Sequence, residues 1–194
     1  MDAAAAQGYS PWTSQSTMSE VLHMAARLEL TQWNRLATGQ AKYEARRYLW
    51  RLALAKGLEV DGKLRKFELD TTIPADGDCL YHSIGRKLGL SAAELRRQLH
   101  DYASNNYDAL IANHPHLFHG VTKPALLHSL GTSGIWGGAP EIAVAAELFQ
   151  RRILVFVYGQ RPVQAFGVGS REEPILLCYE AGSHYMLLEP VPEG

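Results

Sequence analysis

The chain has 194 residues, of which 46% are hydrophobic and 20% are charged, and its formal net charge is −1. This balance predicts a globular protein and gives no bulk charge that would favour nucleic acid or a membrane surface. Its two cysteines, Cys79 and Cys178, are too few for a disulfide framework or a cysteine-rich zinc module. We therefore expect a reducing, cytoplasmic environment, and neither nucleic acid nor a membrane as a partner.

The N-terminal part of the chain is predicted to be helical. Residues 1–16 form a loose leader without the basic and apolar regions of a secretory signal peptide. Helical periodicity begins at Ser19, and a second helix is expected from about Gln40 to Lys56, where Gly57 stops it. Residues 1–65 are thus predicted as a helical extension ahead of a mixed body at 66–194.

The body is predicted to combine helices with a short sheet. Residues 57–72 are interpreted as a hairpin around Asp61-Gly62 or as an irregular linker. Helices are predicted from Cys79 to Gly89, after the Ser91–Glu94 capping box, after Thr122, and from Glu141 to Gln150 behind Pro140.

Three apolar runs near the C-terminus predict strands, at 153–158, 174–179 and 184–188. The turn at 181–183 is expected to join the last two as an antiparallel hairpin. The fold class is therefore predicted as α/β (α+β), with a small central sheet from these strands and helices packed around it.

Cys79 is the strongest candidate for a catalytic residue. It follows an acidic turn, Asp76–Asp78, and opens a predicted helix, so its thiol lies near the positive end of the helix dipole. That position favours thiolate over thiol and suits a nucleophile. Gly77 permits a tight turn. Helix capping is an alternative role for Asp76 and Asp78, and it is compatible with the catalytic interpretation.

A nucleophilic thiol needs a base, and His184 is the best candidate among eight histidines. It follows a short turn at the start of a strand, where a sheet edge can hold the imidazole rigidly. A structural role is the alternative. The histidines at 114, 116 and 119 invite a metal interpretation, but no acidic residue or cysteine lies among them and Pro115 breaks the helix that would align them. We predict no metal site.

Four segments together resemble one protein family. Asp76–Tyr81 resembles the nucleophile motif of the ovarian-tumour (OTU) deubiquitinases. Trp136-Gly137-Gly138, followed by Glu141-Ile142, resembles that family's central motif, and Ile153–Phe156 resembles the strand after it. Gly182–Tyr185 resembles its histidine motif. The motifs occur in the family's order over about residues 70–190, and residues 1–65 lie outside the resemblance.

The resemblance implies a papain-like cysteine peptidase that cleaves the bond after the C-terminal Gly-Gly of ubiquitin. Cys79 would be the nucleophile, His184 the base, and Asp76 part of the catalytic set. Backbone N–H groups of the turn at Gly77 and Asp78 would form the oxyanion site. The implied substrate-binding residues are Trp136, Gly137, Gly138, Ser183 and Tyr185. No metal or cofactor is implied, and the implied partner is ubiquitin or polyubiquitin chains.

One position departs from the family pattern. Many members carry Asn or Asp two residues after the histidine, whereas this chain has Met186, which cannot orient an imidazole. Asp70, Asp61, Ser183, Glu180, a backbone carbonyl or a water are the alternatives for that role.

The departure leaves two other functions open. One is a ubiquitin-binding module with weak or lost catalysis. The other is a cysteine protease that acts on a ubiquitin-like modifier or a polyprotein. The N-terminal helices either contribute to the ubiquitin-binding surface or only complete the core. Trp136 either lines the groove or packs in the core. A bacterial effector or viral protein would act in the host cytosol.

Overall fold

The computed structural model describes residues 39–167, 172–180 and 184–192. The predicted leader, the helix from Ser19 and the turn at 181–183 lie outside these residues. The chain forms two compact units, Met1–Lys56 and Gly57–Gly194. In the first unit the described element is helix α3, Gly39–Lys56, which confirms the second predicted helix. No helix in the described ranges is both long and apolar enough to cross a bilayer.

The second unit begins with a hairpin. Strands β1 (Leu58–Val60) and β2 (Lys63–Arg65) pair antiparallel around Asp61 and Gly62. Both turn residues have positive φ, 53° and 73°, the conformation of a tight hairpin turn in which Asp-Gly is favoured. Of the two interpretations of residues 57–72, the hairpin is therefore the one confirmed.

Four helices follow the predicted signals. Helix α4 (Cys79–Leu88) ends at Gly89, which adopts a left-handed conformation with φ 70°. The side chain of Ser91 caps α5 (Ala92–Asn113), and that of Thr122 caps α6 (Lys123–Gly131). Helix α7 (Ala139–Leu148) has Pro140 in its first turn, as its second residue. The starts of α5, α6 and α7 are specified locally by a capping residue or a proline, and the end of α4 by Gly89, and the sequence predicted all four helices.

In the described part of the chain, five strands form the main sheet in the order β3-β7-β6-β4-β5. They are β3 (Phe67–Leu69), β4 (Ile153–Phe156), β5 (Gln164–Phe166), β6 (Ile175–Glu180) and β7 (His184–Pro190). Strands β6 and β7 form the predicted antiparallel hairpin, and β4 runs parallel to β6. The sheet is wider than predicted, because the sequence analysis did not identify β3 and β5.

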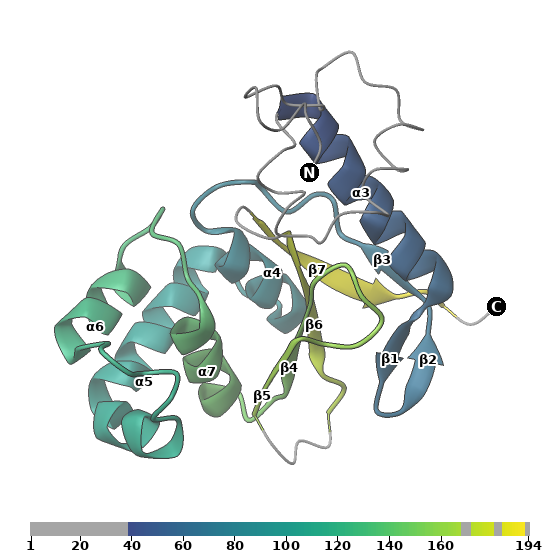
Figure 1. Cartoon of the computed structure of the whole chain (residues 1–194). Helices are drawn as coiled ribbons and strands as arrows, with labels where there is room; N and C mark the ends of the chain where they lie inside the picture. The colour runs from purple at the N-terminus through teal and green to yellow at the C-terminus, as the bar shows by residue number, and fades with distance from the viewer. Residues whose placement is uncertain (1–38, 168–171, 181–183, 193–194) are drawn as a thin grey trace, which may run out of the picture. The chain divides into compact units, whose positions relative to one another are not determined.

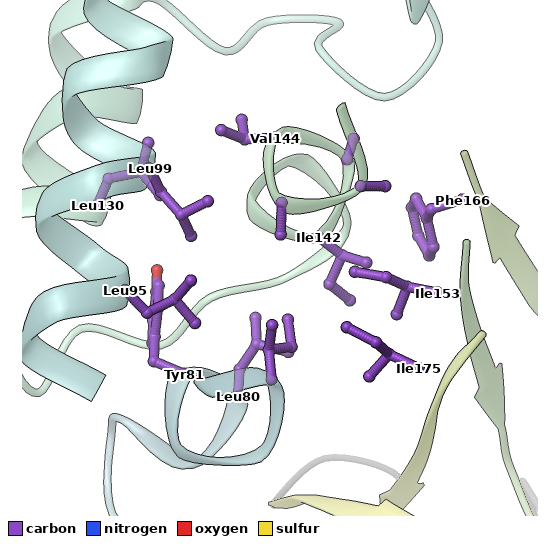
Figure 2. Packing of buried hydrophobic residues seen from close by; sticks show 14 of the residues in the cluster. Leu80, Tyr81, Leu95, Leu99, Leu130, Ile142, Val144, Ile153, Phe166 and Ile175 are labelled. Carbon is purple, nitrogen blue, oxygen red and sulfur yellow. The ribbon is translucent and has the colours of Figure 1, made fainter. Parts of the chain in front are cut away.

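Helices α4 to α7 lie together beside the sheet (Figure 1). Their apolar faces and the facing side of the strands form one buried cluster. Figure 2 shows Leu80 and Tyr81 of α4 between Leu95 of α5 and Ile175 of β6. Helix α4 also packs against β7, and the backbone N–H of Tyr185, near the start of β7, donates to Sγ of Cys79.

Candidate active site

Seven residues from three distant segments surround a single pocket of about 130 Å³. Six of them were predicted as site residues, and the seventh, Tyr179, was not. Ser183 lies outside the described residues. The structure therefore brings the predicted nucleophile, base and Gly-rich loop together in one place. The lining residues are Cys79, Trp136, Gly137, Gly138, Tyr179, His184 and Tyr185.

Cys79 is the first residue of α4, and its side chain is buried, with the residue 5% exposed. The backbone N–H of Tyr185 donates to its Sγ at 3.4 Å. Burial raises the pKa of the thiol, and the N–H groups of Tyr185 and Leu80 oppose that rise only in part. The predicted preference for thiolate is therefore wrong for the resting site, because the loss of water outweighs the helix N-terminus.

His184 begins β7, directly opposite Glu180 of β6. Burial lowers the pKa of its imidazole, and the charges of Glu180 and Asp76 and a backbone hydrogen bond at Ile73 offset only part of that effect. Glu180 is itself buried. Burial therefore works against charge on both the thiol of Cys79 and the imidazole of His184.

The imidazole of His184 makes a backbone hydrogen bond at Ile73. Among the residues that the structure describes, none hydrogen-bonds its buried Nδ1 atom. Asp61 instead binds Arg152 through both carboxylate oxygens, at 2.7 and 2.8 Å. Asp70 binds Thr72 and Arg86. These two alternatives are engaged elsewhere, which leaves Glu180 as the acidic candidate across the hairpin.

The protonation of the pair predicts the pH dependence of Cys79 alkylation. Iodoacetamide reacts with the thiolate, so its rate at Cys79 should still be rising at pH values above the ordinary thiol pKa of about 8.5. The reason is that folding holds the thiol neutral until the pH exceeds its raised pKa. Mass spectrometry of the Cys79 peptide measures the rate. Protein unfolded in urea is the control, and its midpoint should return to the ordinary value. A plateau below that value in the folded protein would instead show a thiolate–imidazolium pair.

The turn before Cys79 is held by Asp76. Its Oδ1 accepts the N–H of Asp78 at 2.8 Å, and its carbonyl accepts the N–H of Cys79 at 3.3 Å. Its Oδ2 lies 3.4 Å from Nε2 of His82. The family resemblance implied open N–H donors at Gly77 and Asp78. The N–H of Asp78 is instead taken by the Asp76 side chain, because that side chain and the Asp76 carbonyl close the turn on itself.

The Gly-rich loop forms one wall of the pocket through Trp136, Gly137 and Gly138. Trp136 is 58% exposed, so its interpretation as a core residue is wrong. Gly137 packs tightly on α4, where an added Cβ would lie 2.7 Å from Leu80 and 3.0 Å from the Tyr81 hydroxyl. Glu141 is buried and accepts hydrogen bonds from Ser129 and from the N–H of Gly138. It therefore supports this wall from behind and does not line the pocket.

Outside the pocket, Cys178 is a free cysteine that is fully buried in β6. His114 lies 2.9 Å from Glu147. Within the described ranges, no group of three or more histidine, cysteine or acidic side chains is arranged to hold a metal ion.

Sequence reasoning missed Tyr179 and Arg96. The ring of Tyr179 lies 4.6 Å from that of Tyr185 and lines the pocket. Arg96 is buried on α5 and pairs with Asp78, next to the nucleophile. The alternation of β6 and the proximity of Tyr179 to the histidine turn could have indicated the first. Nothing local distinguishes Arg96 from the solvent-facing arginines of a helix.

The comparisons with known proteins agree with this arrangement. The family model described as "OTU-like cysteine protease" matches residues 74–185. No curated protein matches the chain. Among solved structures, the viral OTU domain protease from Dera Ghazi Khan virus is 18% identical, with a TM-score of 0.53 over 65% of this chain and 82% of that one.

Two other solved structures share the fold. The Hazara virus OTU domain, bound to ubiquitin, is 23% identical, with a TM-score of 0.52 over 66% of this chain and 83% of that one. The OTU domain of OTUD1 is 18% identical, with a TM-score of 0.51 over 74% of this chain and 91% of that one. The predicted family and mixed α/β fold are therefore confirmed, and the chain belongs to the OTU-like cysteine protease family.

Proposed function

We propose that the chain is a deubiquitinase, a thiol-dependent isopeptidase that hydrolyses the bond after the C-terminal Gly-Gly of ubiquitin. The observation that carries the proposal is the meeting of Cys79, His184 and the Trp136–Gly138 wall around one small pocket. All of them lie within the family match. The Hazara virus relative, which shares the fold, was solved bound to ubiquitin.

The size of the pocket supports a glycine tail as its occupant. Aromatic rings of Trp136, Tyr179 and Tyr185 line a space of only about 130 Å³. A backbone without side chains can enter such a space, whereas a branched residue would meet the rings. The proposed peptidase core is residues 66–194. The chain at 1–65, whose hairpin β1–β2 belongs to the same compact unit as this core, is proposed to add to the ubiquitin-binding surface.

The proposed reaction uses Cys79, His184 and water. As Sγ attacks the carbonyl carbon of the terminal glycine, its proton passes to His184. The C–N bond then breaks, and the imidazolium returns that proton to the leaving lysine amine, which leaves a thioester on Cys79. Water attacks the thioester with His184 again taking a proton. The products are the ubiquitin carboxylate and the free thiol.

The electrostatics of the site suit this sequence of steps. The attack starts from a neutral pair, so the helix N-terminus acts on charge as it develops rather than on a resting thiolate. Gly77 is the proposed oxyanion donor within the turn. Both cysteines are free thiols, which suits the reducing cytosol as the place of action.

A ubiquitin-binding module with weak or lost catalysis is the second candidate. It is favoured by the buried Nδ1 of His184, for which no partner lies among the described residues, and by Met186 in the position that often orients the ring. Such a protein would bind ubiquitin at the same pocket but turn over slowly.

The proposal is tested with ubiquitin that carries a C-terminal electrophile. We expect a covalent adduct that is abolished by Cys79→Ala and kept by Cys178→Ala, because Cys178 is fully buried. Gel shift and peptide mass spectrometry measure it. Ubiquitin binding without an adduct would favour the second candidate. Reaction only with a probe made from a ubiquitin-like modifier would favour the alternative cysteine protease.

A further inference from the structure

A buried arginine lies directly behind the candidate nucleophile. Arg96 of α5 is 4% exposed, and its Nε donates to Oδ1 of Asp78 at 2.6 Å. Asp78 immediately precedes Cys79. A buried guanidinium is costly unless it is fully paired, so its position calls for a specific explanation.

The remaining donors of Arg96 bind the loop that carries the pocket wall. They reach the carbonyl oxygens of Ser129 and Ile135, each at 2.7 Å, and that of Leu130 at 3.3 Å. The guanidinium also lies 3.6 Å above the ring of Tyr81. One side chain therefore joins the first turn of α4 to both ends of the segment before Trp136.

Asp78 occupies the position of a helix cap without acting as one. It precedes the first residue of α4, yet its carboxylate makes no hydrogen bond to the N–H groups of that helix. It accepts instead from Ser133 Oγ at 2.5 Å and from the N–H of Gly134 at 3.1 Å. An aspartate here would ordinarily take the N–H of the second or third helical residue, Leu80 or Tyr81.

The carboxylate is charged in this arrangement. Burial works to raise the pKa of Asp78, but hydrogen bonds from Ser133, Gly134 and Arg96 outweigh it and hold the pKa below its ordinary value. A capping carboxylate would take the N–H of Leu80. In this structure that N–H interacts with the sulfur of Cys79 and lowers the pKa of the thiol. The carboxylate and the sulfur would thus compete for one donor if Asp78 were released.

We propose that Arg96 is a positioning residue for the chemistry of Cys79. With Ser133 and Gly134, it holds the Asp78 carboxylate away from the N-terminus of α4, which leaves the Leu80 N–H to the sulfur. It also fixes the Trp136–Gly138 wall relative to that sulfur. The inference rests on the nucleophilic role proposed for Cys79.

The test measures the reactivity of Cys79 without any ubiquitin. In Arg96→Met, iodoacetamide should alkylate Cys79 about three- to tenfold more slowly at pH 8, since a freed carboxylate next to a thiol disfavours the thiolate. The matched control is Arg97→Met, whose arginine pairs with Glu94 and Asp101 on the exposed face of the same helix. It should react at the wild-type rate.

A second substitution separates charge from packing. Adding Asp78→Ala to Arg96→Met removes both the freed charge and the side chain that would take the Leu80 N–H, and the alkylation rate should return to within about twofold of wild type. Ser133→Ala changes an exposed residue and loses one bond to the carboxylate. It should slow alkylation about twofold in a fully folded protein, and it serves as the test if Arg96→Met does not fold.

Two results would overturn the inference. One is unchanged alkylation in folded Arg96→Met, or in Ser133→Ala, even if the melting temperature falls. The other is a slowed double variant, which would show that packing and not the carboxylate is responsible. Neither depends on the proposed function: failure of every ubiquitin probe would remove that proposal and leave the alkylation comparison intact.

Discussion

Replacing His184 with alanine is expected to lower the turnover of a ubiquitin substrate by at least roughly a hundredfold. The thiol of Cys79 is buried and has a raised pKa, so at neutral pH little thiolate is present before substrate binds. The reaction then depends on a neighbour that removes the proton during the attack. His184 lines the same pocket, and its lowered pKa keeps it unprotonated and ready to accept that proton.

Steady-state hydrolysis of ubiquitin with a C-terminal fluorophore measures the effect. KM should change little, because the imidazole acts in the transition state more than in ubiquitin binding. His119→Ala is the matched control, since His119 is an exposed residue of the loop before α6 and is expected to leave turnover unchanged. Unchanged turnover in His184→Ala would mean that another group removes the proton.

The pH profile of the same enzyme gives a second check on His184. Its lowered pKa predicts that the acidic limb of kcat/KM falls below the ordinary imidazole value of about 6.5. Below that limb the ring is protonated and cannot accept the thiol proton, so activity is lost as the pH falls. An acidic limb above the ordinary value would show that Glu180 and Asp76 dominate over burial.

The parts of the fold that the sequence predicted are those with local signals. Asp61-Gly62 adopts the positive φ angles of a tight hairpin, and Gly89 ends α4 in a left-handed conformation. Strands β3 and β5 were missed because each has three residues, too few to show a period. Each exists through pairing with a distant strand, β3 with β7 and β5 with β4.

The candidate site was likewise predicted where local motifs specify it and missed where contacts between distant segments do. The motif residues Cys79, His184 and Trp136 meet at the pocket, as the order of the motifs predicted. The protonation of Cys79 was predicted in the wrong direction, because burial depends on how β7 packs on α4 and no local pattern reports it. Arg96 was missed for a related reason: its partners, Asp78 and the loop carbonyls, are remote in sequence.

Substituting Gly77 with alanine is the second change for which a large effect is expected. An added Cβ would lie 1.9 Å from the carbonyl oxygen of Gly134 and 2.7 Å from its Cα. These are backbone atoms, so the conflict cannot be relieved by rotating a side chain. The turn before Cys79 and the loop before Trp136 must move apart, at a cost of about 1–3 kcal/mol.

Gly77→Ala should therefore lower the melting temperature by several degrees and reduce kcat/KM by about tenfold or more. Gly159→Ala is the matched control, because its nearest atom would be the Val157 carbonyl oxygen at 3.6 Å, an ordinary contact. Activity is measured well below both melting temperatures, so that lost folding does not count as lost catalysis. Moving the nucleophile turn away from the loop also breaks the hydrogen bond from the Gly134 N–H to Asp78. Alkylation of Cys79 should therefore become slower as kcat/KM falls. Wild-type stability and activity in Gly77→Ala would show that the nucleophile turn and the pocket wall are not packed as the structure places them.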